Sequence, residues 1–286
     1  MRLNLKAVVI ASLAGLLFGF DTAVISGVTH ALRDVYHLDD QGLGLAVSVA
    51  LWGTFFGALF MGRLGDAIGG RDALRIIGLM YIAASLGCAL SPSLALFIVS
   101  RFILGLAIGG SSVLAPVYIS EIVPAERRGA LVGLFQFNIV FGILLAYLSN
   151  YLVGQMITDA SAWRWKLGLA ALPAGVFFLL LFTIGQSARW LVAKGRIDEA
   201  VKSLAQLGIS DTAATIADFQ TSDIGQGRLS WARHKKPIIF AILLALFNQF
   251  TGINAILYYL NDIFAAAGFS AVSADLQSVA VGGANL

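Results

Sequence analysis

The chain alternates between long apolar runs and short polar segments. Seven runs of roughly 20 apolar residues are each long enough to cross the hydrocarbon core of a bilayer as a helix. The pattern predicts spans at Ala7–Val28, Gly42–Gly65, Ala73–Ser91, Leu94–Ile119, Gly129–Val153, Lys166–Ile184 and Pro237–Ala265. A final run, Ala271–Leu286, resembles an eighth span that stops partway. The predicted fold class is all-α, that of a polytopic membrane protein.

The first apolar run has two interpretations, a signal peptide or a transmembrane helix. Arg2 and Lys6 precede it, as basic residues precede the core of a signal peptide. However, the run continues to about Val28 and contains no small-x-small cleavage site before its polar residues. We therefore interpret it as the first transmembrane helix.

Between the sixth and seventh spans, Ser187–Lys236 is polar and contains two short amphipathic stretches, Ile197–Gly208 and Asp211–Gln220. It is either a plain linker or a small helical layer that joins two membrane halves. We predict three regions: residues 1–186 as a six-helix transmembrane half, residues 187–236 as a cytoplasmic helical layer, and residues 237–286 as the start of a second transmembrane half.

Composition supports a membrane protein. Of the 286 residues, 58% are hydrophobic and 12% are charged, with a mean hydropathy of +0.85, too apolar for the surface of a soluble domain of this size. The net charge of +3 does not indicate nucleic-acid binding, because the bases lie in short loops between apolar runs rather than on one stripe.

The distribution of basic residues predicts the orientation. With a cytoplasmic amino terminus, fifteen of the nineteen bases face the cytoplasm, as the positive-inside rule expects. These fifteen are Arg2, Lys6, Arg63, Arg71, Arg75, Arg127, Arg128, Arg189, Lys194, Arg196, Lys202, Arg228, Arg233, Lys235 and Lys236. We expect a multi-pass protein of the plasma membrane, the inner membrane if the source is bacterial.

Cysteine and histidine usage argues against several kinds of site. Cys88 is the single cysteine, so an intrachain disulfide framework is excluded, and the three histidines are too scattered for a zinc site. Asp21, Glu121 and the histidines do not form a nucleophile–base set. We expect no enzymatic activity, no metal and no cofactor other than a coupling proton.

Two charges lie deep inside predicted spans, well away from the span ends. Asp21 in the first span and Arg101 in the antiparallel fourth both lie roughly 10–12 Å below the outer surface. An isolated charge at that depth costs on the order of 2–3 kcal/mol, so we predict that they pair. The pair is either a static packing contact or a titratable site, in which protonation of the aspartate releases the guanidinium.

The seventh span is unusually rich in amides. Asn248, Gln249 and Asn254 flank Gly252, a pattern that predicts a helix broken near the glycine and lining a cavity. Tyr258 follows Asn254 by one turn, and Gln136 adds a buried amide in the fifth span. Amides both donate and accept hydrogen bonds, so this set is suited to a neutral, hydroxyl-rich ligand.

Five motifs resemble the sugar porter family of the major facilitator superfamily, along essentially the whole chain. The motifs are Phe18-Gly-Phe-Asp-Thr-Ala-Val-Ile-Ser-Gly27, Gly62-Arg-Leu-Gly-Asp66 with Gly69-Gly70-Arg71, Arg101-Phe-Ile-Leu-Gly105, Pro116-Val-Tyr-Ile-Ser-Glu121-Ile-Val-Pro124-Ala-Glu-Arg-Arg128-Gly129 and Asn248-Gln-Phe-Thr-Gly-Ile-Asn254-Ala-Ile-Leu-Tyr258-Tyr259. The fourth fits P-x-Y-x-x-E-x-x-P-x-x-x-R-G at every fixed position.

The resemblance implies twelve helices in two halves, with a sugar bound between them and alternating access by rocking. It also implies that Asp21 takes the proton beside Arg101. The implied substrate-binding residues are Phe18, Gln136, Asn248, Gln249, Asn254 and Tyr258. The implied cytoplasmic gate consists of Asp66, Arg71, Glu121, Arg128 and Arg189. The partners are then a small sugar and the lipid bilayer, with no nucleic acid, and the full-length protein is a monomer.

The chain departs from the family pattern in several places. Gly70 and Asp72 flank Arg71 where two bases are usual, and Gln186 replaces an acid at the end of the sixth span, which predicts a weaker cytoplasmic lock. Asn248 replaces the first glutamine of a Gln-Gln pair. We also expect the chain to be truncated after the start of the eighth helix.

Three functions remain open. The leading hypothesis is a proton-coupled symporter of a monosaccharide, either a pentose or a hexose. A facilitative sugar or polyol uniporter would use the same pocket without the proton. A non-transporting sugar sensor is the third alternative.

Overall fold

The computed structural model describes residues 5–206, 209, 211–224 and 231–286. All regular structure in these residues is helical, which confirms the all-α class. In chain order the elements are α1 (Leu5–Val24), η1 (Ile25–Gly27), α2 (Thr29–Tyr36), α3 (Asp40–Ile68), α4 (Gly70–Leu90), α5 (Leu94–Ile122), η2 (Ala125–Arg127), α6 (Arg128–Met156), α7 (Ala162–Gly168), α8 (Ala171–Leu180), η3 (Leu181–Thr183), α9 (Ala188–Ala193), α10 (Ile197–Gln206), α11 (Thr212–Ile224), α12 (Trp231–Phe250), α13 (Ile253–Tyr258), α14 (Leu260–Ala266) and α15 (Ala271–Asn285).

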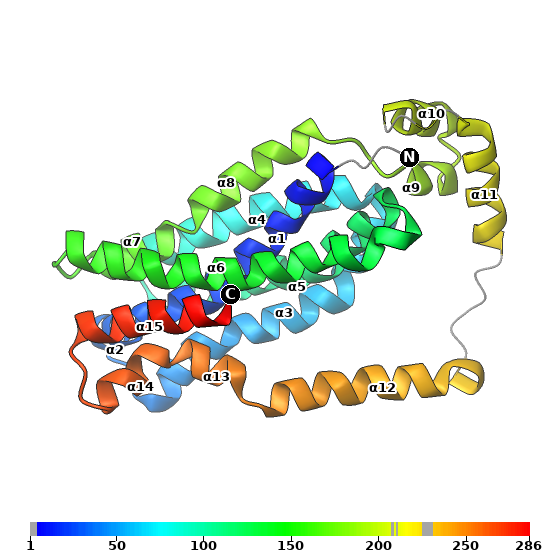
Figure 1. The fold of residues 1–286 in the computed structure, drawn as a ribbon. Helices are drawn as coiled ribbons and strands as arrows, with labels where there is room; N and C mark the ends of the chain where they lie inside the picture. Colours follow the sequence, from blue (N-terminus) through cyan, green and yellow to red (C-terminus); the bar gives the residue numbers. More distant parts are fainter. Residues whose placement is uncertain (1–4, 207–208, 210, 225–230) are drawn as a thin grey trace.

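Residues 5–183 build a bundle of six helical segments (Figure 1). They are α1 with η1, α3, α4, α5, α6 and the segment from α7 to η3, and each is long and apolar enough to cross a membrane. The main pairs are α3 with α5 and α1 with α6, while α4 packs on α5, α7 and α8. The six predicted spans therefore coincide with helices of the bundle.

Glycines allow the two main helix pairs to approach closely. A Cβ at Gly19 of α1 would lie 1.8 Å from the carbonyl oxygen of Ile139 on α6. A Cβ at Gly109 of α5 would lie 2.0 Å from the carbonyl oxygen of Thr54 on α3. Neither position has room for a side chain, so backbone packs directly on backbone at these crossings.

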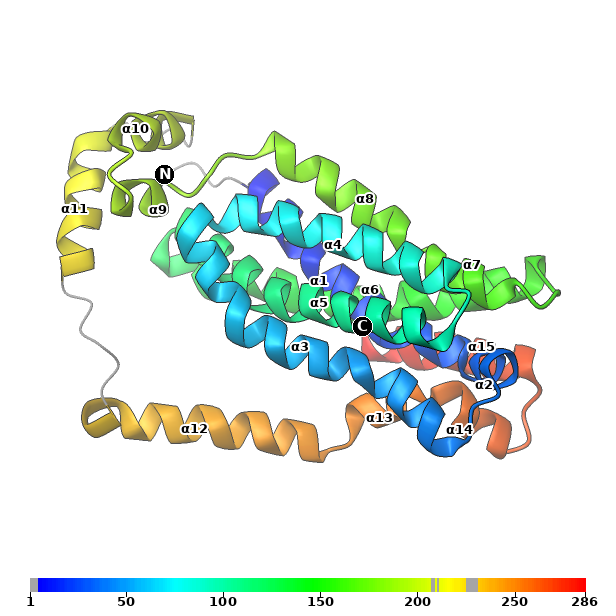
Figure 2. The ribbon, with the colours of Figure 1, turned by 180° about the vertical axis from the view of Figure 1, so that it is seen from behind.

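The seventh segment is broken where the amide-rich pattern predicts. Helix α12 ends at Phe250 and α13 begins at Ile253, and Gly252 between them adopts the left-handed conformation with φ +72°. Helix α12 lies beside the bundle in both views (Figures 1 and 2). None of the residues in its most apolar stretch is buried. Helices α13 to α15, by contrast, pack against α1, η1 and α6.

The two ends of the bundle differ (Figures 1 and 2). Helices α9, α10 and α11 form a small unit at one end, the near end, around a core that includes Leu191, Ala200 and Leu204. Helices α2, α7 and α14 lie at the opposite end, the far end. The predicted stretch Ile197–Gly208 corresponds to α10, although its last two residues lie outside the described part. The boundaries of the three predicted regions stay a prediction.

Candidate functional site

A buried ion pair joins α1 to α5 inside the bundle. The Nη1 atom of Arg101 donates a hydrogen bond to Oδ1 of Asp21 over 2.5 Å, and the side chains are 0% and 4% exposed. The predicted contact between these two residues is confirmed. Among the described residues, no hydrogen-bond partner meets the other buried nitrogens of Arg101, Nε and Nη2. The guanidinium therefore depends on the aspartate for its charge partner.

The seventh segment reaches this pair through Tyr258. Tyr258 at the end of α13 is buried in one apolar cluster with Phe20 and Val24 of α1. Its side chain interacts with Thr22, the neighbour of Asp21 in the chain. One of the predicted substrate-binding residues, Tyr258, thus lies next to the ion pair. A movement of Tyr258 would therefore alter the surroundings of Asp21.

The remaining predicted substrate-binding residues are not assembled into one site. The side-chain amide of Asn254 donates to Oε1 of Gln249 over 2.8 Å, and Gln249 and Asn248 are exposed. Gln136 is exposed on α6, and Phe18 is half-buried against the core of the bundle. Figure 1 shows α12 apart from α6. Because α12 stands apart from α6, the amides of the two helices do not converge in this structure.

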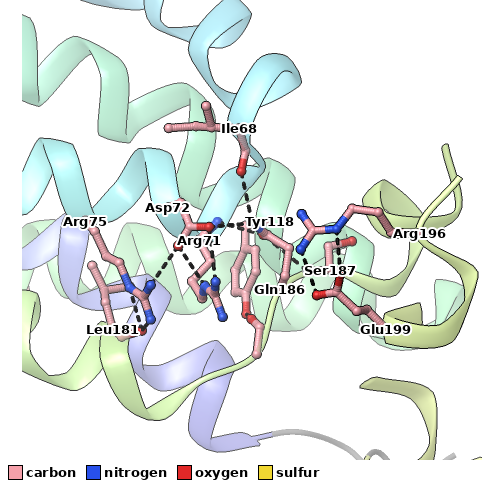
Figure 3. A network of polar contacts seen from close by, with 11 residues as sticks. Ile68, Arg71, Asp72, Arg75, Tyr118, Leu181, Gln186, Ser187, Arg196 and Glu199 are labelled. Carbon is pink, nitrogen blue, oxygen red and sulfur yellow. Dashed lines mark hydrogen bonds and ion pairs between the residues drawn. The ribbon is translucent and has the colours of Figure 1, made fainter. Parts of the chain in front are cut away.

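A polar network at the near end is centred on Asp72 (Figure 3). Arg71 pairs with Asp72 at 3.0 Å and Arg75 pairs with it at 2.8 Å. Gln186 donates to Oδ2 of Asp72 over 3.3 Å and to the carbonyl oxygen of Ile68 over 3.2 Å, and its Oε1 accepts the backbone N–H of Arg71 over 3.1 Å. Gln186 thus ties the end of the sixth span to the start of α4.

Asp72, Arg75 and Gln186 were not among the predicted gate residues. The sequence carried a signal for two of them, because Asp72 and Gln186 are both departures from the family pattern. In the structure they are partners: a carboxylate stands at position 72 and an amide at position 186, and a hydrogen bond joins them. Arg71, a predicted gate residue, makes its ion pair with Asp72.

Three of the other predicted gate residues come together. Glu121, Arg128 and Arg189 line one cavity of about 350 Å³ between α5, α6 and the small helices α9 and α11. Asp66 is placed differently: its side chain is exposed, and its backbone carbonyl accepts a hydrogen bond from the indole of Trp190 over 3.0 Å. The gating role of these residues stays a prediction.

A surface ion pair lies beside the network, between Arg196 just before α10 and Glu199 in its first turn. Nε and Nη2 of Arg196 each donate to one carboxylate oxygen of Glu199 over 2.7 Å (Figure 3). These hydrogen bonds lower the pKa of Glu199 and raise the pKa of Arg196 from their ordinary values. Both side chains are about half exposed, so solvent screens the pair.

No group of three or more histidine, cysteine, aspartate or glutamate side chains that could hold a metal occurs within the described residues.

Comparison with known families gives a match along nearly the whole chain. The family model described as "Sugar (and other) transporter" matches residues 7–286. A D-xylose transporter of Levilactobacillus brevis is 37% identical over 278 residues, which cover 95% of this chain and 60% of that protein. The D-xylose-proton symporter of Escherichia coli K12 is 34% identical over 313 residues, covering 97% of this chain and 63% of that protein.

Solved structures agree in fold. The partially occluded inward-open xylose transporter XylE of E. coli superposes with a TM-score of 0.85 at 31% identity, covering 97% of this chain and 69% of that one. XylE bound to 6-bromo-6-deoxy-D-glucose, described as a proton:xylose symporter of the major facilitator superfamily, gives a TM-score of 0.85 at 32% identity. The chain spans about 60% of the length of the curated relatives it matches, and these relatives are transporters rather than enzymes.

Proposed function

The chain belongs to the Sugar (and other) transporter family, and from this premise we propose that it forms the proton-carrying part of a symporter that moves a monosaccharide by alternating access. The observation that carries the proposal is the Asp21–Arg101 pair, a carboxylate and a guanidinium buried together in the middle of a membrane bundle. Ionisable groups at such positions usually serve a transport pathway or a proton relay.

The coupling step follows from the charge balance of this pair. When Asp21 binds a proton it becomes neutral, and Arg101 loses the carboxylate that compensates its charge. The described part of the protein offers no second hydrogen-bond partner to Nε and Nη2, so the protonated state favours a rearrangement of α1 against α5. A proton at Asp21 is thereby linked to the conformation of the bundle.

The proposed substrate is a neutral sugar, a pentose or a hexose. The relatives are named for D-xylose, glucose and myo-inositol, all of which are rich in hydroxyl groups. The amides of Gln136, Gln249 and Asn254 can donate to and accept from such groups, and Tyr258 would connect the sugar to the Asp21–Arg101 pair. Closure of α12 against α6 would bring these residues together.

The proposed orientation places the near end in the cytoplasm and the far end outside. The small unit α9–α11 contains basic residues, and positive charge favours the cytoplasmic side. The protein would then be a multi-pass component of the plasma membrane, with the bilayer and the sugar as its partners and a monomer as its working form.

The test uses a protein that includes this chain and has the full length of its relatives, reconstituted in proteoliposomes. We expect labelled xylose or glucose to accumulate only under an inward proton gradient and to lose accumulation when a protonophore is added. Counterflow without a gradient should persist. Uptake that only equilibrates the sugar, with or without the gradient, would indicate a uniporter. The absence of counterflow for every pentose, hexose and inositol tested would indicate a sensor.

A further inference from the structure

A second buried ion pair lies at the far end of the bundle. Nζ of Lys166, on α7 in the six-span half, is 3.7 Å from Oδ2 of Asp275, on α15 beyond the seventh segment. The two side chains are only 10% and 11% exposed. Unlike Asp21 and Arg101, which both belong to the six-span half, these residues come from the two parts of the chain that alternating access would move relative to one another.

Hydrogen bonds extend the pair into a continuous connection. Nζ of Lys166 also donates to the carbonyl oxygen of Gly27 in η1 over 3.0 Å. On the other side, the amide of Asn261 on α14 donates to Asp275, and the hydroxyl of Ser278 donates to Oδ1 of Asn261 over 2.5 Å. The connection therefore runs from the end of the first span, through α7, into α14 and α15.

A second contact lies nearby at the same end. The hydroxyl of Thr29 donates to Oδ1 of Asp262 on α14 over 3.2 Å, and Nε2 of His30 lies 3.1 Å from the same oxygen. A cavity of about 240 Å³ is lined by residues of both contacts, among them His30, Lys166 and Asp275, and by Ser26. Both contacts join the six-span half to α14 and α15, but the His30 side chain is 70% exposed and its interaction is screened.

Among the described residues of the second part outside α14 and α15, α13 packs on α1 and its Leu257 carbonyl accepts a hydrogen bond from Tyr147, but no ion pair joins α13 to the six-span half. The most apolar stretch of α12 has no buried residue, whereas α14 packs on η1 and α15 packs on α6. The two parts of the chain are thus joined at the far end and separate along α12. The buried polar groups at this junction lie where opening of the far end would have to separate the two parts.

We propose that the Lys166–Asp275 pair, with Asn261, is a latch that holds the far end of the carrier closed. The inference rests on the proposed function in one respect: alternating access requires the far end to open, and opening must separate Lys166 from Asp275. In the closed state each charge is buried and compensated by the other. In the open state each is exposed to water.

The expected effect of breaking the latch follows from desolvation. Removing one partner leaves the other charge buried and uncompensated in the closed state, while the open state hydrates it. A single substitution at either position should therefore shift the population towards an open far end. A charge exchange that recreates the pair should restore closure.

The experiment measures accessibility, not transport. Cys88, the single cysteine of the chain, is replaced by serine, and a reporter cysteine is introduced at Ser26, which lines the cavity and is 1% exposed. The reaction rate with a charged methanethiosulfonate reagent is measured for the purified protein in lipid nanodiscs. We expect Lys166→Met and Asp275→Asn each to raise this rate about five- to tenfold. The exchange Lys166→Asp with Asp275→Lys should return it towards the starting value.

The matched control is the Arg33–Asp40 pair. It also lies at the far end, at 2.8 Å, but it joins α2 to α3 within the six-span half and is 45% and 88% exposed. Arg33→Met should leave the reporter rate unchanged. Equal rates in the Lys166 and Asp275 variants and the parent would overturn the latch. So would a raised rate that the charge exchange fails to reverse, because general loosening of the far end would then explain it.

A second reporter separates the latch from the proposed transport cycle. Gln136→Cys, placed at an exposed position on α6, monitors access between α6 and α12. If alternating access holds, releasing the latch should lower labelling at position 136 as it raises labelling at position 26. A rise at position 26 with no change at position 136 would support the latch while counting against the alternating-access cycle.

Discussion

At the residue scale, the burial of a charged side chain decides how strongly an ion pair stabilises it. Arg101 and Asp21 are almost completely buried, so each stabilises the other against a large cost of desolvation. The Arg196–Glu199 pair is bidentate, with two hydrogen bonds of 2.7 Å, but both side chains are about half exposed, so water and salt screen it. In the proposed coupling, the buried Asp21–Arg101 pair, rather than the exposed one, links protonation to the packing of α1 against α5.

Loss of one member of the buried pair should be costly. We predict that Arg101→Met lowers the free energy of unfolding by about 3–5 kcal/mol, because Asp21 is left buried without its counter-charge. Adding Asp21→Asn should recover roughly 2 kcal/mol, since the uncompensated carboxylate is removed. Thermal unfolding in detergent measures both values. A double variant that is no more stable than Arg101→Met would show that the two side chains are not coupled.

Asp72 has two guanidinium partners and an amide partner, so it should matter more than an ordinary surface acid. We predict that Asp72→Asn lowers stability by about 1 kcal/mol, because Arg71 and Arg75 then repel one another without a shared carboxylate. Glu199→Gln is the matched control and should change thermal stability by less than about 0.5 kcal/mol. Equal effects of the two variants would contradict a central place for Asp72 in the near-end network.

At the scale of elements, backbone-to-backbone packing of glycines holds the bundle together. Gly19 of α1 packs on the backbone of Ile139 of α6 with no space for a methyl group. Around Gly133, also on α6, a methyl group would have no neighbour within 4 Å. The same residue type therefore has opposite roles at the two positions. Gly19 permits a close crossing, while Gly133 only adds flexibility to an exposed helix.

The two glycines give a paired test of this packing. We predict that Gly19→Ala destabilises the protein by about 2 kcal/mol or more, because α1 and α6 must move apart. Gly133→Ala should be neutral or stabilising by about 0.5 kcal/mol, since alanine favours the helix. Unfolding midpoints of the two variants, measured side by side, should move in opposite directions or differ clearly. Similar midpoints would contradict close packing at Gly19.

Most of the helices could be predicted from the sequence. The spans follow from the length of apolar runs, and the break at Gly252 follows from a glycine among amides. Helix α2 was not predicted, because it is a short element that continues from the end of the first span. The Asp72–Gln186 contact was not predicted either: it joins residues 114 positions apart, and only the packing of α4 against the end of the sixth span brings them together.

The candidate site could be predicted only in part, because some of its contacts depend on how distant segments pack together. Depth within antiparallel spans is readable from position along each helix, so Asp21 and Arg101 could be paired from sequence. The distance between Gln136 and Gln249 depends instead on how α12 sits against α6, a property of the arrangement of the two parts of the chain. No local pattern encodes that arrangement, so the residues are identifiable but their convergence is not.

At the scale of the whole molecule, we propose separate roles in a transport cycle for two buried ion pairs. Asp21–Arg101 lies within the six-span half and would change with protonation of Asp21, while Lys166–Asp275 joins the two parts and would separate when the far end opens. Tyr258 lies close to the first pair and belongs to the same segment as the amides of the sugar set. A sugar that draws α12 inward would therefore act on both the substrate residues and the surroundings of Asp21.

The most direct test of this account compares two transport modes of Asp21→Asn in the full-length carrier. In proteoliposomes, proton-gradient-driven accumulation of sugar should fall to the equilibrium ratio of about one, because asparagine cannot carry the proton. Counterflow, which needs only the sugar site and alternating access, should persist within about tenfold of the parent. Undiminished uphill accumulation by Asp21→Asn would contradict proton coupling through Asp21.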